Sequence, residues 1–111
     1  MRIDLGPELD RFRDEIRAWI AANSPTGLAD LAPWNEDETR AYLQSSLSQA
    51  GRKQPAFDDR AVRRLFELSG GAPRKVNQLA QLALLAGAGQ NLLQVDAATI
   101  DGVEEELSVG R

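Results

Sequence analysis

The residues best placed to do chemistry in this 111-residue chain are two neighbouring cations, Arg74 and Lys75. They follow Pro73 in the stretch SGGAPRKVNQLA (residues 69–80), which reads as a helix start because proline is favoured at a first helical position. The helix dipole disfavours cations there by a few tenths to about 1 kcal/mol. Unpaired backbone N–H groups already make this end electropositive, so the two added cations predict a compact anion site suited to phosphate.

A structural explanation of the same cations is also open. Arg74 could reach back to the carboxylate of Glu67, or to the carbonyl groups that end the preceding helix. Such a pairing would stabilise the fold, whereas an anion site would leave Arg74 with little part in stability.

Carboxylates cluster at residues 36–38 (EDE) and 104–106 (EEE). Two such clusters could in principle hold a hard cation or act as an acid–base pair. We interpret the first as complementing a helix N-terminus and the second as a solvated face. The sequence therefore predicts no metal site and no catalytic residue.

Three arginines and two tryptophans allow more than one interpretation. Arg60, Arg63 and Arg64 lie at helical spacings, either as a solvated face paired with nearby acids or as part of an anion or partner surface. Trp19 and Trp34 could anchor an interface. Trp19 falls on an apolar stripe, which favours the core, whereas the place of Trp34 is open.

The composition excludes several kinds of chemistry. The chain has no Cys and no His, which removes disulfides, thiolate and imidazole catalysis and the usual zinc and haem ligands. A net charge of -4 does not indicate a nucleic-acid partner. No apolar run approaches the roughly 18 residues of a membrane span, and the charged N-terminus does not read as a secretory signal. We expect a cytoplasmic protein without a membrane partner or a cofactor.

Hydrophobic periodicity predicts an all-α fold, a compact bundle of about five helices with short loops. One stripe of helical spacing runs through Leu9, Phe12, Ile16, Trp19 and Ile20. The predicted helices are residues 7–23, the segment from a cap at 35 to a stop at 51, the segment from 58 to the glycines at 70 and 71, residues 73–86, and residues 97–107. Residues 28–31 are expected to form a turn, 87–91 a loop, and 92–95 a short extended stretch with no obvious partner.

A longer stretch resembles a known family. Its order is PWNEDETRAYLQSSLSQAG, then AFDDRAVRRLFELSGGAPRKVNQLAQLALL, then VDAATIDGVEEEL. Its distinctive element, G-x-P-R-x-V/I-N, is matched by Gly71, Pro73, Arg74, Val76 and Asn77. Residues 33–107 thus resemble the C-terminal helical lid of AAA+ ATPases of the ExeA/GspA secretion type, which follows a nucleotide-binding α/β domain.

The resemblance implies that Arg74 is a sensor 2 residue, which approaches the phosphates of a bound nucleotide. The P-loop (GxxxxGKS/T), the Walker B acid and sensor 1 of the family are absent from the sequence. Hydrolysis is therefore not implied, and a phosphate site at Arg74 and Lys75 would be vestigial, with Gly71, Pro73 and Asn77 as supporting residues.

The first thirty residues resemble a different family. The run F-R-x-E-V/I-R-x-W-L/I is similar to the opening helix of acyl-CoA dehydrogenases, at Phe12, Arg13, Glu15, Ile16, Arg17, Trp19 and Ile20. In those enzymes the helix is structural, and no flavin-binding or catalytic-base segment is present here. Two ancestries that meet near residues 30–32 suggest a chimera: one domain over residues 1–111, in which an added helix (1–30) covers apolar surface of a lid-like bundle (33–107).

Two functions follow as hypotheses. The first is a structural helical domain, natural or engineered from natural fragments, with no catalytic activity; if it is engineered, a cellular location does not apply. The alternative is a detached lid module, which binds nucleotide phosphate weakly at Arg74 or docks on an ATPase core. Neither requires a partner chain, although the stripe on the first helix could also pair with a second copy.

Overall fold

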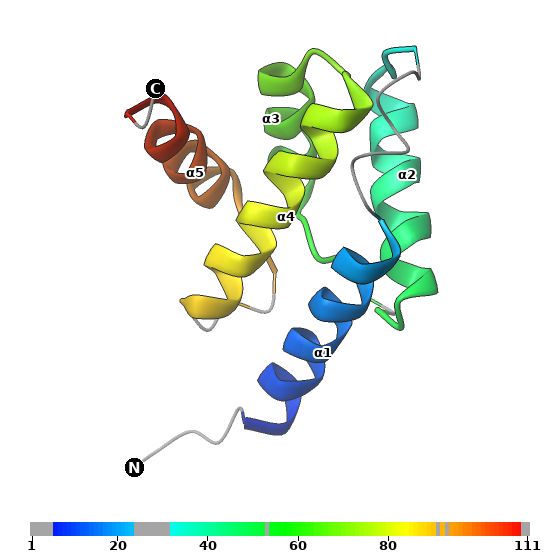
Figure 1. The fold of residues 1–111 in the computed structure, drawn as a ribbon, viewed down its shortest axis with the longest axis vertical. Coiled ribbons are helices and arrows are strands. Elements are labelled where there is room, and N and C mark those ends of the chain that lie inside the picture. Colours follow the sequence, from blue (N-terminus) through cyan, green and yellow to red (C-terminus); the bar gives the residue numbers. More distant parts are fainter. Residues whose placement is uncertain (1–5, 24–31, 53, 91, 93, 110–111) are drawn as a thin grey trace.

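The computed structural model describes residues 6–23, 32–52, 54–90, 92 and 94–109. This part of the chain contains five α-helices (Figure 1). They are α1 (Gly6–Ala22), α2 (Glu36–Gln49), α3 (Asp59–Ser69), α4 (Pro73–Gly89) and α5 (Ala97–Val109). The predicted all-α fold is confirmed. The turn predicted at 28–31 lies outside the described residues.

The starts of α2 and α3 follow from local hydrogen bonds. The side chain of Asn35 accepts from the Glu38 N–H at 2.7 Å, and the Glu38 carboxylate accepts from the Asn35 N–H at 3.0 Å. This reciprocal pair is a capping box. At α3, the Asp58 side chain accepts from the Ala61 N–H at 2.7 Å. The predicted cap at Asn35 is confirmed, and Asp58 caps the helix that was predicted to begin there. Each cap satisfies N–H groups that a helix start would otherwise leave unpaired.

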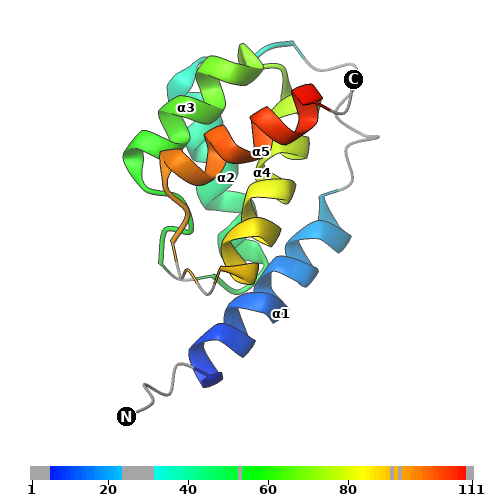
Figure 2. The same cartoon turned by 90° about the vertical axis from the view of Figure 1, so that its left-hand side faces the viewer.

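Helix α4 is the central element of the fold. It contacts α1, α3 and α5, while α2 packs on α1 and α3. Figure 1 shows α4 running through the middle of the molecule between α5 and α2. Figure 2 shows α1 along one side of the bundle, with its N-terminal end extending past the other helices. The start of α4 therefore has its position set by helices that lie far apart in the sequence.

The apolar stripe of α1 lies in the core, as predicted. Phe12 and Trp19 are 0% exposed, Ile16 is 1% exposed and Leu9 is 8% exposed. Ile20 is partly buried against the same cluster. Each large side chain buried in this way contributes about 1.5–3 kcal/mol before entropy is deducted. One core is therefore shared between α1 and the helices that follow it.

Polar contacts also fix α1 on the end of α2. The Trp19 indole N–H donates to the Ser46 hydroxyl at 2.8 Å. Arg52, just after α2, forms an ion pair with Glu15 at 3.3 Å, and its guanidinium lies 4.7 Å from the centre of the Phe12 ring. These side chains are almost fully buried, so their polar groups need these partners. The register of α1 against α2 is thus specified by polar as well as apolar groups.

The end of α4 differs from the prediction. The glycines after Ala86 read as a loop, but the helix continues to Gly89. Gly87 is buried, and a Cβ there would lie 3.0 Å from a methyl group of Val95. The Leu92 N–H donates to the Gly87 carbonyl at 2.8 Å. Gly87 therefore allows a close approach of the following segment instead of breaking the helix.

The stretch at residues 92–95, predicted to be extended and without a partner, is paired at Val95. The Val95 N–H donates to the Ala56 carbonyl at 2.7 Å, and the Asp58 N–H donates to the Val95 carbonyl at 3.1 Å. Phe57 and Val95 thereby form an isolated parallel β-bridge. A pairing this short shows no alternation in the sequence, so periodicity could not predict it. It ties the connector before α3 to the connector before α5.

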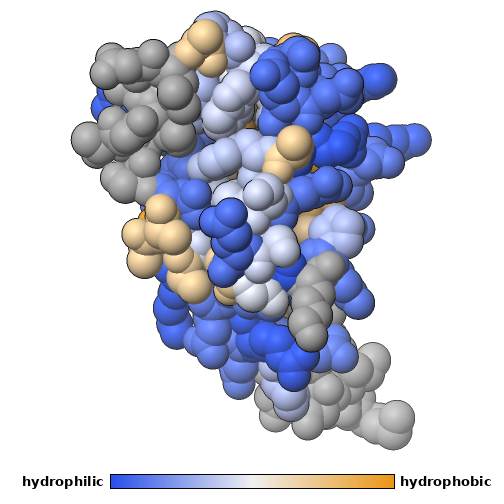
Figure 3. Space-filling view, turned by 90° about the vertical axis from the view of Figure 1, so that its right-hand side faces the viewer, coloured by the Kyte–Doolittle hydropathy of each residue, from blue (hydrophilic) through white to orange (hydrophobic). Residues whose placement is uncertain are grey.

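The surface is mixed in character. The side of the molecule on which α2 lies is largely hydrophilic, and its hydrophobic residues form small separate patches (Figure 3). Leu85 on α4 is a large hydrophobic residue with 47% of its surface exposed. In the described ranges, no helix combines the length and the apolar character that crossing a membrane requires.

Candidate functional site

The turn between α3 and α4 is built from two glycines in left-handed conformations. Gly70 has φ 63° and ends α3, where its N–H donates to the Phe66 carbonyl at 2.8 Å. Gly71 has φ 79°. These values cost other residues about 1–2 kcal/mol. The predicted role of the two glycines as a helix end is confirmed. Because the turn is so short, α4 begins at Pro73, soon after α3 ends at Ser69.

The backbone of Trp34 holds this turn in place. The Trp34 N–H donates to the Gly71 carbonyl at 2.8 Å. A Cβ on Gly71 would lie only 1.9 Å from the Trp34 carbonyl oxygen, so no side chain fits at this position. The glycine of the motif is therefore required by contact with the segment before α2. Trp34 itself is partly buried, and its ring lies 4.6 Å from the ring of Tyr42 between centroids.

Helix α4 begins without a side-chain cap. Ala72 occupies the capping position, Pro73 comes first, and the first turn holds no acidic residue. Helices α2 and α3 instead have a capping side chain and at least one acid in their first turns. The start of α4 thus combines uncapped N–H groups with two cations, which is the electrostatic arrangement that favours an anion.

Arg74 and Lys75 differ from the neighbouring motif residues because their charged groups form no ion pair within the described part of the chain. Arg74 is exposed and Lys75 is half-buried. Among the residues that the structure describes, neither forms an ion pair, and Arg74 donates no hydrogen bond to a carbonyl. Glu67 pairs with Arg64 at 3.6 Å instead. The structural explanation, in which Arg74 reaches back to Glu67 or to the end of α3, is therefore not what the structure contains.

An open hollow of about 320 Å³ lies beside Arg74 on the outer face of α4. Gln78, Gln81 and Leu82 also line it. Its volume is near the lower end of that of small-molecule sites. Within it, Arg74 supplies a cation and the two glutamines supply amide groups that can donate or accept hydrogen bonds. The hollow offers an anion a charged end and polar side contacts.

Asn77, the last residue of the motif, lies inside the fold. It is 0% exposed, and its amide Nδ2 donates to the Tyr42 hydroxyl at 2.8 Å. The Tyr42 hydroxyl donates in turn to the Asn23 side-chain oxygen at 3.4 Å. Burial raises the pKa of Tyr42, and the hydrogen bond from Asn77 opposes this rise. Sequence reasoning did not identify Tyr42 and Asn23 as residues of this site. The one available signal was a tyrosine on an apolar helix face, whose hydroxyl needs a hydrogen-bond partner.

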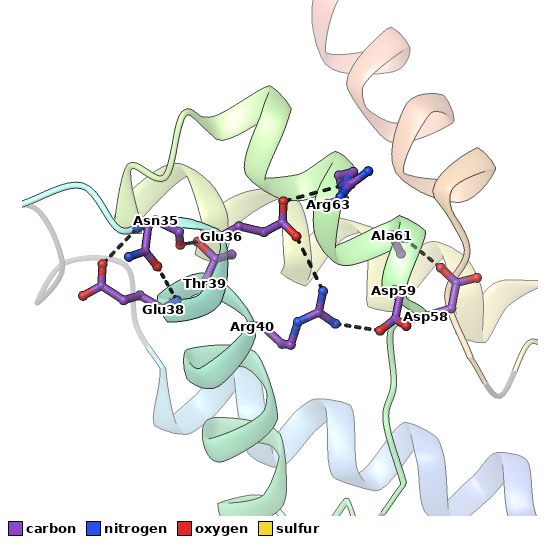
Figure 4. A network of polar contacts seen from close by, with 9 residues as sticks. All are labelled: Asn35, Glu36, Glu38, Thr39, Arg40, Asp58, Asp59, Ala61 and Arg63. Atoms are coloured by element: carbon purple, nitrogen blue, oxygen red, sulfur yellow. Dashed lines mark hydrogen bonds and ion pairs between the residues drawn. The ribbon is translucent and has the colours of Figure 1, made fainter.

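The first acidic cluster lies in an ion-pair network between α2 and α3 (Figure 4). Glu36 lies between Arg40 at 3.7 Å and Arg63 at 3.6 Å, and Arg40 also reaches Asp59 at 2.7 Å. The cluster complements the start of α2 and joins it to α3, in agreement with the prediction for residues 36–38. In the described part of the chain, no group of three or more Asp, Glu, His or Cys residues could hold a metal ion.

The arginines of α3 are mostly paired. Arg63 contacts Glu36, and Arg64 binds both Glu67 and Asp101. Arg60 is exposed. Two of the three arginines therefore serve contacts within and between helices, which favours the solvated face over an anion surface. Among the cations weighed from the sequence, the pair at the start of α4 remains the best candidate for a bound anion.

A sequence comparison relates this region to a secretion protein. Over 80 residues the chain is 34% identical to General secretion pathway protein A of Aeromonas hydrophila. The match covers 72% of this chain and 15% of that protein. A stretch of 80 residues within 111 must include residues 32–80, so it contains Trp34, Tyr42 and the turn that leads to Arg74. No family model matches the chain, and no solved structure matches it.

The match supports one of the two resemblances. The name of the matched protein is that of the GspA type, so the match supports the resemblance of residues 33–107 to that type, and their role as a lid stays a prediction. The resemblance of residues 1–30 to acyl-CoA dehydrogenases stays a prediction, as does an origin of the chain by fusion. The site at the start of α4 therefore belongs to the part of the chain that has a similar counterpart in a known protein.

Proposed function

We propose that this chain is a helical lid-type module without catalytic activity of its own, and that Arg74 and Lys75 bind nucleotide phosphate. The binding is weak in the isolated module. It is stronger where the module docks on an ATPase core that holds the nucleotide, since the core supplies the other phosphate contacts. In this function Arg74 has the role of a sensor 2 residue.

The division of roles within one short motif carries the proposal. Gly71 is fixed by the Trp34 backbone, Pro73 is buried at the first helical position, and Asn77 is fully buried against Tyr42. Arg74, between them, is exposed and forms no ion pair among the described residues. Its neighbours explain the shape of the turn, whereas no contact in the described part of the chain explains the cation. A bound anion would.

The similarity to General secretion pathway protein A supports the proposal that the module acts within a protein of that type. The match spans only 15% of that protein, so an ATPase core and a secretion role are part of the proposal and rest on the lid resemblance. The net charge of -4 argues against a general affinity for anions. A phosphate that binds here must therefore be held locally, at the start of α4.

The test is a titration with ATP, followed through the backbone amide signals of residues 71, 72 and 74–76 in the NMR spectrum. We expect shifts at millimolar ATP in the unmodified chain and their loss in Arg74→Ala. Arg60→Ala is the matched control, because it removes one exposed arginine from a different helix and should leave the shifts unchanged. No shift at millimolar ATP, or the same shift in Arg74→Ala, would overturn the proposal.

A second candidate is a purely structural domain, assembled from natural helical fragments. The observation that favours it is the depth of α1 in the core, where Phe12 and Trp19 are fully buried. Because the stripe is covered within one chain, no second copy is needed to cover it. A solution mass measurement should then give a monomer, and a stable dimer would show that α1 also pairs between chains.

A further inference from the structure

A chain of hydrogen bonds joins three helices at the side chain of Tyr42. The Asn77 amide on α4 donates to the Tyr42 hydroxyl on α2, and this hydroxyl donates to Asn23 at the end of α1. We propose that the Tyr42 hydroxyl is a positioning group, through which the docking of α1 sets the orientation of the first turns of α4. Arg74 lies in those turns, so α1 controls how Arg74 is presented.

On the side of α1, the contact is firmly held. The backbone N–H and the side-chain amide of Asn23 both donate to the Trp19 carbonyl at 2.9 Å, which fixes Asn23 to the end of its helix. The Trp19 indole donates to Ser46, whose hydroxyl donates to the Tyr42 carbonyl at 2.7 Å. A displacement of α1 therefore reaches Tyr42 at both its side chain and its backbone.

On the side of α4, Tyr42 acts on the site from two directions. Asn77 lies three residues after Arg74, which is within one turn of the helix. The Tyr42 ring also lies against the ring of Trp34, whose backbone holds Gly71. The hydroxyl and the ring of one residue thus reach both the turn before Arg74 and the helix after it.

The Asn77 amide makes this coupling sensitive to the hydroxyl. Its Oδ1 is buried and has no hydrogen-bond partner in the described part of the chain, so Nδ2 is the group that anchors the side chain. A buried amide that loses its partner carries the full cost of desolvation. No cap holds the first turn of α4 independently. Loss of the hydroxyl should therefore change the local geometry of α4 as well as the overall stability.

The experiment compares three single variants by amide shifts and amide exchange. Tyr42→Phe removes the hydroxyl and keeps the ring, and Asn23→Ala removes the acceptor on α1. Ile100→Val, on the buried face of α5, is the control for a general loss of stability. We expect the first two variants to shift the backbone amide signals of residues 71, 72 and 74–76. They should speed the exchange of the hydrogen-bonded amides of Gly71, Ala72 and Val76 about two- to tenfold, because one hydrogen bond is worth about that factor.

Asn23→Ala decides the matter, because Asn23 does not bond to any residue of the α4 start directly. Unchanged amides at residues 71–76 in Asn23→Ala would overturn the proposal, as would equal changes in Ile100→Val. In the double variant Tyr42→Phe/Asn23→Ala, we expect no further change beyond Tyr42→Phe, since one hydroxyl carries both effects. Should Tyr42→Phe not fold, Asn23→Ala alone still gives the answer.

The consequence for phosphate rests on the proposed function and is measured separately, with inorganic triphosphate as the probe. We expect Asn23→Ala to weaken triphosphate binding about fivefold, a modest value for coupling between two sites. Unchanged triphosphate binding in Asn23→Ala would show that the orientation of the first turns of α4 does not affect the affinity of Arg74 for phosphate. If the unmodified chain itself gives no triphosphate shifts, the proposed function fails, whereas the coupling of α1 to α4 is still judged by the amides.

Discussion

Individual residues of one motif serve separate purposes in this chain. Gly71 and Asn77 make contacts that only a glycine and a buried amide can make, whereas Arg74 between them contributes an exposed charge. The cations were identified from the sequence because their place at a helix start conflicts with the helix dipole. The roles of Trp34 and Tyr42 could not be found in this way, since they depend on contacts between segments distant in the chain.

Gly71→Ala should destabilise the fold strongly. The added Cβ combines a left-handed backbone with an overlap with the Trp34 carbonyl, so we expect a loss of at least about 2 kcal/mol in the free energy of unfolding. Gly70→Ala is the control, because its φ is also positive but a Cβ there meets nothing within 4 Å. Urea denaturation of both variants measures the difference, and equal losses would contradict the contact with Trp34.

Asp96 should stabilise α5 in a pH-dependent manner. The backbone N–H and hydroxyl of Thr99 both donate to it at 2.9 Å, which lowers its pKa below the ordinary 3.8. Its contribution is present above pH 3.8 and is lost as the pH falls through the lowered value. Asp96→Ala should cost about 0.5–2 kcal/mol at pH 7. The difference from the unmodified chain should shrink in acid, and a constant difference down to pH 2 would exclude this role.

Tyr42 gives a pH dependence of the opposite sign. Burial raises its pKa above the ordinary 10.0, so the folded state holds the proton more tightly than the unfolded state. Its contribution to stability is therefore complete below pH 10 and is lost as the pH rises through the raised value. Tyr42 is the only tyrosine of the chain, so an ultraviolet absorbance titration follows it alone. A midpoint at or below 10 would show that the hydroxyl is not buried as described.

At the scale of the helices, capping residues and apolar spacing predicted the elements better than the positions of glycines did. The caps of α2 and α3 and the apolar stripe of α1 were read correctly, because each depends on residues within a few positions of one another. The predicted end of α4 was wrong, because Gly87 allows a close contact with Val95, a residue outside α4. The bridge between Phe57 and Val95 was missed for the same reason.

Helix α1 should exchange its amide hydrogens as part of the folded unit. Its stripe is buried, and its polar side chains reach Ser46 and Arg52, so opening α1 alone exposes a large part of the core. We expect the amides between Phe12 and Ile20 to be protected to an extent similar to those of α4, as measured by hydrogen exchange. Exchange at the rate of a free peptide, with α2 to α5 protected, would refute a shared core.

For the whole molecule, the fold was more predictable than the function. Helical periodicity and short connections were enough for an all-α bundle, because in this chain each helix carries its own apolar face. A functional site depends on what lies beside a helix start, and only the structure placed Trp34, Tyr42 and the end of α1 there. The central place of α4, in contact with α1, α3 and α5, explains how events on α1 can reach Arg74.

Arg74 is positioned by the fold but, on the proposed function, does not contribute to its stability. The direct measurement is the free energy of unfolding of Arg74→Ala. Because the cation opposes the helix dipole and forms no ion pair among the described residues, we expect stability to be unchanged or raised by up to about 1 kcal/mol. A loss of more than about 1 kcal/mol would contradict the account, since Arg74 would then be a structural residue.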